Sequence, residues 1–222
     1  MICFESAEAA VGTVCPNAFL LGPRNRYYYM STQGEIEMIG VRFRHGGFSP
    51  FTKIPVDAFM NQILSLRDIF GNVAENWLNK LYEAGQSQAR ITCIQNILSA
   101  QLQVSHDVHQ ALALISTVRK SESETIQEIC NQTGVYYKKM ERIFSKYTGY
   151  NPKNFSRVVR FYRSLQEMKH ADTSLTSIGL YHGYYDQAHF IKDFKAFTGT
   201  SPSQFEWQGT TIANLLLSSN HV

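Results

Sequence analysis

The sequence predicts a mainly α-helical fold in which two helix-turn-helix units, joined by a spacer helix, follow a small partial β-sheet and some helices. Three observations lead to this prediction. A pattern of apolar residues, glycines and prolines occurs twice in the second half of the chain. Apolar residues recur at helical spacing from Pro55 onward, whereas strand-like segments are confined to the residues before it.

Composition describes an ordinary globular protein. A length of 222 residues suits one large domain or two small ones, and 44% of the residues are hydrophobic. The chain has no run of about 18 apolar residues, and its acidic first ten residues lack the build of a secretory signal. We therefore expect a cytoplasmic protein that makes no membrane contact. The scattered cysteines argue against a zinc site or a disulfide framework, so we expect free thiols, no metal and no cofactor: Cys3, Cys15, Cys93 and Cys130.

The first hundred residues predict a small sheet followed by helices. Residues 19–21 and 36–44 have strand-like content, and turns at Gly22-Pro23 and Gly34 separate them. Helical spacing then begins at Pro55. The apolar residues that show it fall into three series: Phe59, Ile63, Leu66, Ile69 and Phe70; Trp77, Leu78, Leu81 and Tyr82; and Ile91, Ile94, Ile97 and Leu98.

An internal repeat occupies the second half. Seven residues recur in order: Ile129, Gly134, Phe144, Thr148, Gly149, Pro152 and Phe155 return as Ile178, Gly183, Phe194, Thr198, Gly199, Pro202 and Phe205. The offset is 49 for the first two pairs and 50 for the others. The second copy therefore has one extra residue in or just after the turn that follows its glycine.

Each copy predicts a short helix, a glycine turn, a longer helix and a stop. In the first copy Ser123 or Thr125 caps the short helix and Gly134 ends it. The longer helix buries Met140, Ile143, Phe144 and Tyr147, and its counterpart buries Phe190, Phe194 and Phe197. Cys130 and Gly179 are small, which lets the two helices of each copy cross closely. This arrangement is typical of a helix-turn-helix.

A spacer helix is predicted between the two copies. Asn151 caps it, Pro152 is its first residue, and it ends near His170. Its length of about 27 Å suits two units placed about one DNA turn, roughly 34 Å, apart. The residues expected to face inward are Phe155, Val158, Val159, Tyr162, Leu165 and Met168.

Charge is distributed unevenly. Residues 1–104 are neutral, whereas residues 136–163 hold eight basic residues and one acid, a net charge of +7. This fits either a solvated helix face or a surface for phosphates, and the two repeats with their spacer favour DNA. In residues 174–205, Lys192 and Lys195 are balanced by Asp186 and Asp193, which predicts a neutral second unit.

Residues 105–205 resemble the DNA-binding domain of the AraC/XylS family of bacterial transcription regulators. The resemblance rests on ICNQTGV and FSKYTGYNPKNF in the first unit, and on IGLYHGYYDQAHFIKDFKAFTGTSPSQF in the second. It implies a seven-helix domain that inserts recognition helices, here residues 136–147 and 186–197, into the major groove near a promoter. The base-facing positions that it implies are Tyr136, Tyr137, Lys138, Lys139, Arg142, Asp186, Gln187, His189 and Lys192.

Side-chain chemistry refines these roles. Lysine and arginine either read guanine or neutralise phosphate, and Gln187 suits adenine. Asp186 more naturally caps the second recognition helix, and His189 either contacts DNA or packs, since it occupies the place of Met140. Contacts with the DNA backbone are expected from Lys146, Lys153, Asn154, Arg157 and Arg160.

The amino-terminal segments GPRNR and GVRFRHGGFSPF resemble the end of a cupin-like sensory domain found in one branch of this family. The resemblance begins inside that domain, which predicts a truncated member. We expect a partial sensory or dimerisation domain with a helical extension in residues 1–104, the DNA-binding domain in 105–208 and a tail in 209–222. His45 is expected to be structural, because a cupin metal site needs several histidines. Four arginines either bind an anionic effector or form a solvated strand face: Arg24, Arg26, Arg42 and Arg44.

The leading hypothesis is a transcription regulator without enzymatic activity. Its expected partners are double-stranded DNA, RNA polymerase through the second unit, a second copy in a homodimer, and a small-molecule effector. The alternative is a truncated regulatory fragment that acts through protein–protein dimerisation. An enzyme such as a DNA-repair alkyltransferase ranks third, because Cys130 falls at a packing position and no Cys-His arrangement supports a nucleophile.

Overall fold

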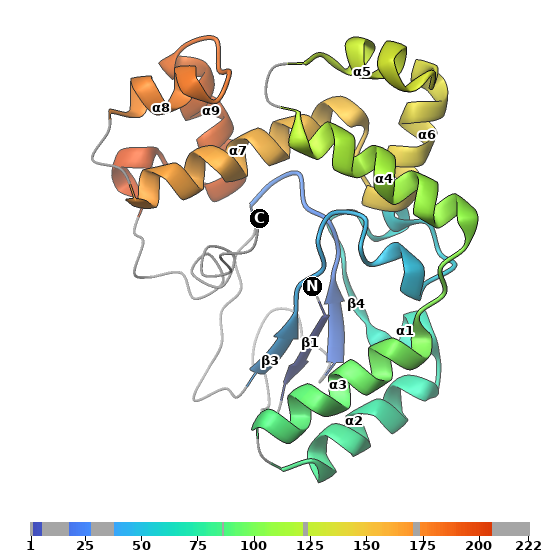
Figure 1. The fold of residues 1–222 in the computed structure, drawn as a ribbon. Coiled ribbons are helices and arrows are strands. Elements are labelled where there is room, and N and C mark those ends of the chain that lie inside the picture. Colours follow the sequence, from blue (N-terminus) through green and yellow to red (C-terminus); the bar gives the residue numbers. More distant parts are fainter. Residues whose placement is uncertain are drawn as a thin grey trace.

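The computed structural model describes residues 2–5, 18–27, 38–85, 87–121, 124–170 and 174–205. These residues form a mainly helical protein with a small sheet in the first half (Figure 1). The expectations for Cys15, Gly34, Ser123 and the tail lie outside the described residues.

The sheet has four antiparallel strands in the order β3-β1-β2-β4. They are β1 (Ile2–Glu5), β2 (Ala18–Leu21), β3 (Met38–Val41) and β4 (Ile63–Ser65). In the register, Phe19 lies opposite Cys3 on one side and opposite Ser65 on the other. All four residues of β2 are buried, so both faces of this strand are covered. The sequence predicts β2 and β3, but not β1 or β4.

The helix expected from Pro55 to Phe70 is wrong. A 3-10 helix, η2 (Val56–Phe59), leads through a turn into β4, and the α-helix α1 covers only Leu66–Phe70. Asn61 takes a left-handed φ of 58° in this turn, which ends helical geometry. Pairing with β2 then overrides the helical spacing of the apolar residues. Another 3-10 helix, η1 (Ser49–Phe51), precedes this region.

Two longer helices complete the first half: α2 (Val73–Glu83) and α3 (Ser87–Gln101). Trp77, Leu81, Ile94 and Ile97 are buried in one core that also includes Leu20 of the sheet. Tyr82 and Ile91, which belong to the second and third predicted apolar series, stay exposed. Neither helix, nor any other in the described ranges, is long and apolar enough to cross a bilayer.

The second half confirms the predicted helical domain. Its described part contains six α-helices and a 3-10 helix: α4 (His106–Lys120), α5 (Ile126–Thr133), α6 (Tyr137–Thr148), α7 (Pro152–His170), α8 (Leu175–Tyr181), α9 (Gln187–Thr198) and η3 (Pro202–Gln204). Pairs α5–α6 and α8–α9 are the two helix-turn-helix units, and they lie at opposite ends of α7 (Figure 1).

Local signals in the sequence define most helix ends. Thr125 caps α5 in a reciprocal capping box with Glu128, and Gly134 ends the helix with a left-handed φ of 67°. The Asn151 Oδ1 accepts a hydrogen bond from the Asn154 N–H at 2.8 Å and so caps α7. The extra residue of the second unit lies between Gly183 and the start of α9, as the change in repeat offset predicts.

The spacer helix α7 uses different faces for the two units. Phe155 and Val159 belong to the core of the first unit, whereas Phe161 and Leu165 belong to that of the second. Phe161 is absent from the predicted inward series, because that series assumes one continuous apolar face. Its ring lies edge-on to Phe194 and stacks on Phe197.

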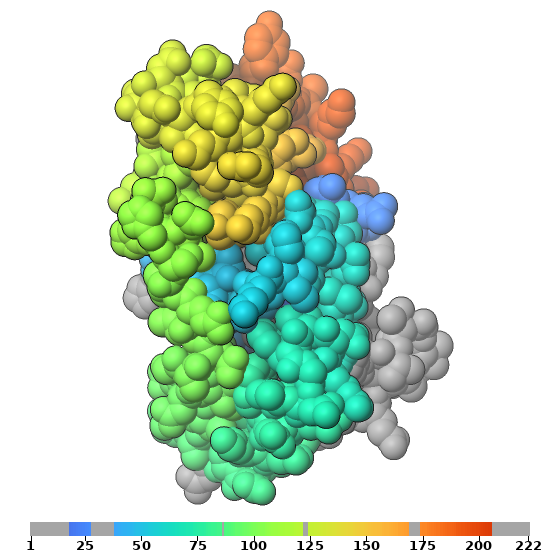
Figure 2. All heavy atoms as spheres, turned by 90° about the vertical axis from the view of Figure 1, so that its right-hand side faces the viewer, coloured from blue at the N-terminus to red at the C-terminus, as the bar shows by residue number. Residues whose placement is uncertain are grey.

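The two halves of the chain pack against each other. The segment around η2 lies directly against α6 in the space-filling view (Figure 2), where the Ser145 hydroxyl donates a hydrogen bond to the Asp57 carboxylate. The Tyr27 N–H also donates to the Ala196 carbonyl oxygen of α9 at 3.2 Å. The described helix-turn-helix units are therefore in contact with the sheet-containing half.

Candidate nucleic-acid interface

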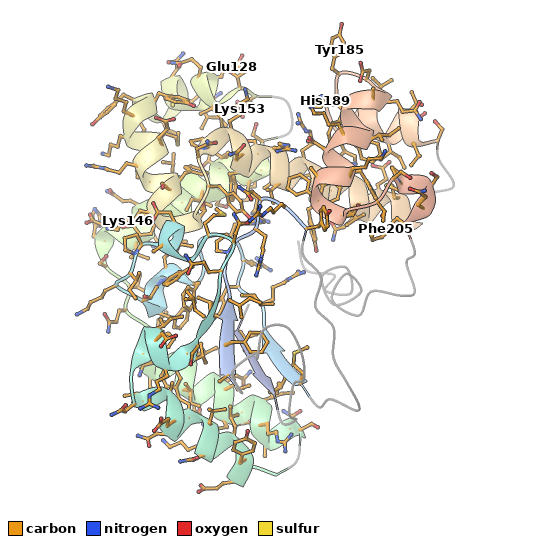
Figure 3. The ribbon with its side chains drawn as sticks, turned by 180° about the vertical axis from the view of Figure 1, so that it is seen from behind. Glu128, Lys146, Lys153, Tyr185, His189 and Phe205 are labelled. Carbon is orange, nitrogen blue, oxygen red and sulfur yellow. The ribbon has the colours of Figure 1, made fainter. Side chains whose placement is uncertain are left out.

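The first recognition helix, α6, has two contrasting faces. Met140 and Phe144 on the inner face are 0% exposed. The exposed side chains at its start and along its outer face are basic or aromatic: Tyr136, Tyr137, Lys138, Lys139, Arg142 and Lys146. Lys146 projects from the edge of the molecule in Figure 3. The only acid in α6 is the half-buried Glu141. This surface is suited to a polyanion.

The second recognition helix, α9, begins at a side-chain cap. The Asp186 Oδ1 accepts a hydrogen bond from the His189 N–H at 2.7 Å, which confirms the expected capping role. Gln187 and Lys192 are exposed, and the Gln187 Oε1 accepts a hydrogen bond from the Thr176 hydroxyl at 3.0 Å. The half-buried His189 ring packs edge-on against Tyr184. Of the two interpretations of His189, packing is the one that these contacts favour.

Two arginines expected at the DNA backbone are engaged inside the protein. Arg157 donates through Nε to the Asp193 Oδ1 at 2.8 Å, and its guanidinium lies over the Phe197 ring. Arg160 lies over the Tyr184 ring and donates to the Gly183 carbonyl oxygen at 3.2 Å. Both side chains therefore hold the second unit against α7.

Arg163 is also used internally, since its Nη2 donates to the Arg119 carbonyl oxygen at 2.6 Å, near the end of α4. Arg157, Arg160 and Arg163 thus all donate hydrogen bonds within the protein. Lys153 and Asn154, in the first turn of α7, remain exposed.

Burial of Asp193 changes the charge of the second unit. This carboxylate contacts Arg157 and lies 3.8 Å from the nearer Arg160 nitrogen, with a side chain only 4% exposed. Lys192 and Lys195 are exposed on α9. The surface of α9 is therefore more positive than the balanced count along the sequence predicts.

An aromatic surface in the second unit is missing from the predicted site. Tyr181 is 77% exposed at the end of α8, and Tyr185 is 88% exposed just before the cap of α9. Tyr185 points away from the body of the protein at the tip of the unit (Figure 3). The turn before the cap of α9 also contains Tyr184, which is buried, so local sequence alone does not single out Tyr185.

The four candidate effector arginines follow β2 and β3. Both strands are antiparallel to β1, so they run in the same direction and leave the sheet at the same end. Arg42 there contacts the Tyr162 hydroxyl at 3.5 Å, and the Arg24 backbone contacts Tyr150. The structure places Arg26 and Arg44 at the surface.

His45 packs between the two halves. Its ring lies edge-on to Phe155 with centroids 5.0 Å apart. Burial lowers its pKa from 6.5 to about 4, and the nearby charges of Arg119 and Arg42 add to the effect. These contacts support the structural role expected of it. In the described ranges, no three His, Cys, Asp or Glu side chains are grouped so as to hold a metal.

Comparison with known proteins agrees with this geometry. A helix-turn-helix domain family matches residues 129–207, and a domain of unknown function, DUF6597, matches residues 2–65. No solved structure shows a significant match.

Three relatives are regulators by name. The probable transcription factor PqrA of Proteus vulgaris is 28% identical over 97 residues, which are 44% of this chain and 80% of the relative. The HTH-type transcriptional regulator ArgR of Pseudomonas aeruginosa is 26% identical over 137 residues, 62% of this chain and 40% of the relative. The lactose operon transcription activator of Staphylococcus xylosus is 26% identical over 110 residues, 49% of this chain and 39% of the relative.

The chain thus spans most of the first relative but less than half of the other two. The residues that the helix-turn-helix family matches, 129–207, run from within α5 to beyond η3 and so include most of both helix-turn-helix units. The chain thus carries an AraC-type helix-turn-helix domain after a DUF6597 domain, and it is similar to AraC/XylS-like transcriptional regulators.

Proposed function

We propose that the protein binds double-stranded DNA in a sequence-specific manner by inserting α6 and α9 into successive major grooves near a promoter. The observation that carries this proposal is the contrast between the two faces of α6. Met140 and Phe144 on its inner face are fully buried, and its outer face presents four basic side chains and no exposed acid. The major groove of B-DNA admits such a helix, and its phosphates attract the charges.

In this proposal α6 is the principal reading helix. Lys138, Lys139 and Arg142 contact guanine edges or the adjacent phosphates, with Tyr136 and Tyr137 beside them. Lys146, Lys153 and Asn154 contact the DNA backbone. Arg157 and Arg160 act indirectly, because their contacts hold α9 on the spacer helix.

The second unit contributes a smaller set of groups. Gln187 reads adenine, Lys192 and His189 lie beside it, and Tyr185 contacts the sugar-phosphate backbone at the entrance of α9. The 19 residues of α7 span about 28 Å, which suits two helices in grooves roughly 34 Å apart.

The first half, in this proposal, regulates binding and carries no catalytic activity. It takes up an anionic small-molecule effector near Arg24, Arg26, Arg42 and Arg44, or forms the contact between two copies. RNA polymerase is the expected protein partner of the second unit. A protein that forms a tight dimer but binds no DNA would instead be a regulatory fragment.

The test is a titration of the full chain against promoter fragments from its own genomic neighbourhood at several salt concentrations. We expect sequence-dependent, salt-sensitive binding to at least one fragment. Absence of such binding from every fragment would overturn the proposal.

Matched variants then locate the interface. Arg142→Ala should raise the Kd for the specific site by about tenfold, since one charged base or phosphate contact is lost. Lys80→Ala removes the same charge from an exposed position on α2 and should leave the Kd unchanged. Equal effects of the two variants would remove Arg142 from the interface.

A further inference from the structure

The segment Gly22–Tyr27, here called the strap, connects the sheet to both helix-turn-helix units. It begins directly after β2 and first meets the end of α6. Gly149, the C-cap of α6, has φ +80°, and a Cβ there would lie 3.0 Å from the Pro23 Cγ. The next residue, Tyr150, donates its hydroxyl to the Arg24 carbonyl oxygen at 2.6 Å and accepts from the Arg24 N–H at 2.8 Å. The strap is therefore in close contact with the first unit.

The other end of the strap meets the end of α9. Gly199, the C-cap of α9, has φ +84°, and a Cβ there would lie 3.0 Å from two carbons of the Tyr27 ring. The Tyr27 N–H also donates to the Ala196 carbonyl oxygen at 3.2 Å. A side-chain contact and a backbone hydrogen bond thus join the strap to the second unit.

The two contact points are equivalent positions of the repeat. Gly149 and Gly199 are the C-caps of the two recognition helices and are separated by the repeat offset of 50 residues. The backbone from Pro23 to Tyr27 reaches at most about 14 Å when fully extended. One short segment therefore limits how far the ends of the two recognition helices can separate.

The strap is itself fixed to the first half. The Asn61 N–H donates to the Pro23 carbonyl oxygen at 2.8 Å, and its Oδ1 accepts from the Asn25 N–H at 3.2 Å. Among the residues that the structure describes, Asn61 alone combines a side chain with a positive φ. The Gly22 N–H donates to the Gln62 carbonyl oxygen at 3.1 Å. A Cβ on Gly22 would lie 1.8 Å from the Phe59 carbonyl oxygen. These contacts leave the strap little freedom to move independently of the sheet.

We propose that the strap sets the spacing and relative orientation of α6 and α9, with Pro23 and Tyr27 as positioning residues. This inference rests on the proposed two-groove binding. A single helix such as α7 can bend along its length, whereas a second link between the units restricts that bending. The strap follows β2 directly, so a displacement of this strand reaches both recognition helices together.

A distance measurement without DNA tests the strap. Spin labels are attached through Arg142→Cys and Lys192→Cys, exposed and equivalent positions of the two helices, after the native cysteines are replaced by serine or alanine. Pulsed electron–electron double resonance then gives the distribution of distances between the two spin labels. We expect Tyr27→Ala to broaden the distribution, and Tyr27→Phe and Arg26→Ala to retain the parent's width. An unchanged distribution in Tyr27→Ala would overturn the proposal, provided that circular dichroism shows both proteins folded.

A binding measurement tests the consequence for DNA. DNA fragments are prepared in which one to three base pairs are inserted or deleted between the two halves of the recognised site. The Kd is then measured for each spacing. We expect the parent to prefer one spacing by about tenfold or more, and Tyr27→Ala to lose most of this preference. Retention of the full preference in Tyr27→Ala would contradict the inference. A parent that binds no DNA would contradict the proposed function, and the distance measurement alone would then decide on the strap.

Discussion

Arg157 on the spacer helix and Asp193 on the second recognition helix form a partly buried ion pair, in which the Asp193 side chain is buried and that of Arg157 is 33% exposed. Two nitrogens of the Arg157 guanidinium, Nε and Nη2, each lie 2.8 Å from the Asp193 Oδ1. The Asp193 side chain is 4% exposed, so the carboxylate depends on protein partners for compensation of its charge. The pair fixes the orientation of α9 on α7.

Loss of Arg157 should therefore destabilise the second unit. In Arg157→Ala, Asp193 keeps only Arg160, whose nearest nitrogen is 3.8 Å away. The buried carboxylate is then poorly compensated, and we expect the free energy of unfolding to fall by roughly 2 kcal/mol, which is less than for a fully buried pair. Urea denaturation measures this loss. Lys153→Ala, on the exposed side of the same helix, is the control and should have little effect.

A double variant separates the charge from the packing. Arg157→Met combined with Asp193→Leu removes both charges, and it should recover most of the stability that the single change loses. If Arg157→Ala were no less stable than Lys153→Ala, the pair would have no structural importance.

The lowered pKa of His45 predicts a stability that depends on pH. The folded value is about 4 and the reference value is 6.5, so the unfolded chain binds more protons between these two pH values. The free energy of unfolding should therefore fall as the pH drops from about 6.5 toward 4, by on the order of 2 kcal/mol from this group.

Thermal or urea unfolding at several pH values measures this fall. His45→Phe keeps an aromatic ring beside Phe155 and should remove the contribution. His109→Phe, at an exposed position on α4, should retain it. A parent and a His45→Phe variant with the same pH profile would exclude His45 as the cause.

Two glycine caps should respond differently to the same substitution. Gly134 and Gly149 both have positive φ, but a Cβ on Gly134 meets no atom within 4 Å, whereas one on Gly149 meets Pro23, Met60 and Val56. Gly134→Ala should cost about 1 kcal/mol of folding free energy from backbone strain alone. Gly149→Ala adds a collision with the first half and should cost 1 to 2 kcal/mol more, roughly, by the usual cost of overpacking. Equal losses in denaturation would show that the two halves do not pack at this point.

The exposed Tyr185 should affect binding and leave stability unchanged. Its side chain is 88% exposed, so Tyr185→Ala removes almost no packing and should keep the parent's Tm. If Tyr185 contacts DNA beside α9, as we propose, the Kd should rise by roughly three- to tenfold, as expected for loss of one aromatic contact. Tyr82→Ala, at an exposed position on α2, is the matched control. A Kd that is the same for both variants would exclude Tyr185 from the interface.

Local signals explain why the second half is predictable. The bounds of α6, α7 and α9 agree with the sequence to within a residue or so, because a cap or a glycine marks their ends. The inner and outer faces of α6 follow from its 3.6-residue period alone. In the first half, Ile63, Leu64 and Ser65 form a strand although their spacing predicts a helix, because β2 supplies the partner. The residues of β2 that pair with β4 are 42 to 46 positions away in the chain. The sequence around Ile63–Ser65 therefore does not indicate that this strand partner exists.

The sequence by itself determines the two helix-turn-helix units, the spacer helix and the residues of α6 that face solvent, since these depend on periodicity and on nearby caps. Only the tertiary structure decides how the charges are used and how the units are held. Arg157 and Arg160 belong to the basic segment that suggests a DNA-binding surface. In the structure they contact the second unit instead, because the buried Asp193 lies beside them. Asp193 is 36 and 33 positions further along the chain. Likewise, nothing local to Gly22–Tyr27 indicates that it contacts both recognition helices. These contacts join residues that are far apart in the chain. The local sequence pattern around either partner therefore does not indicate that the two residues meet.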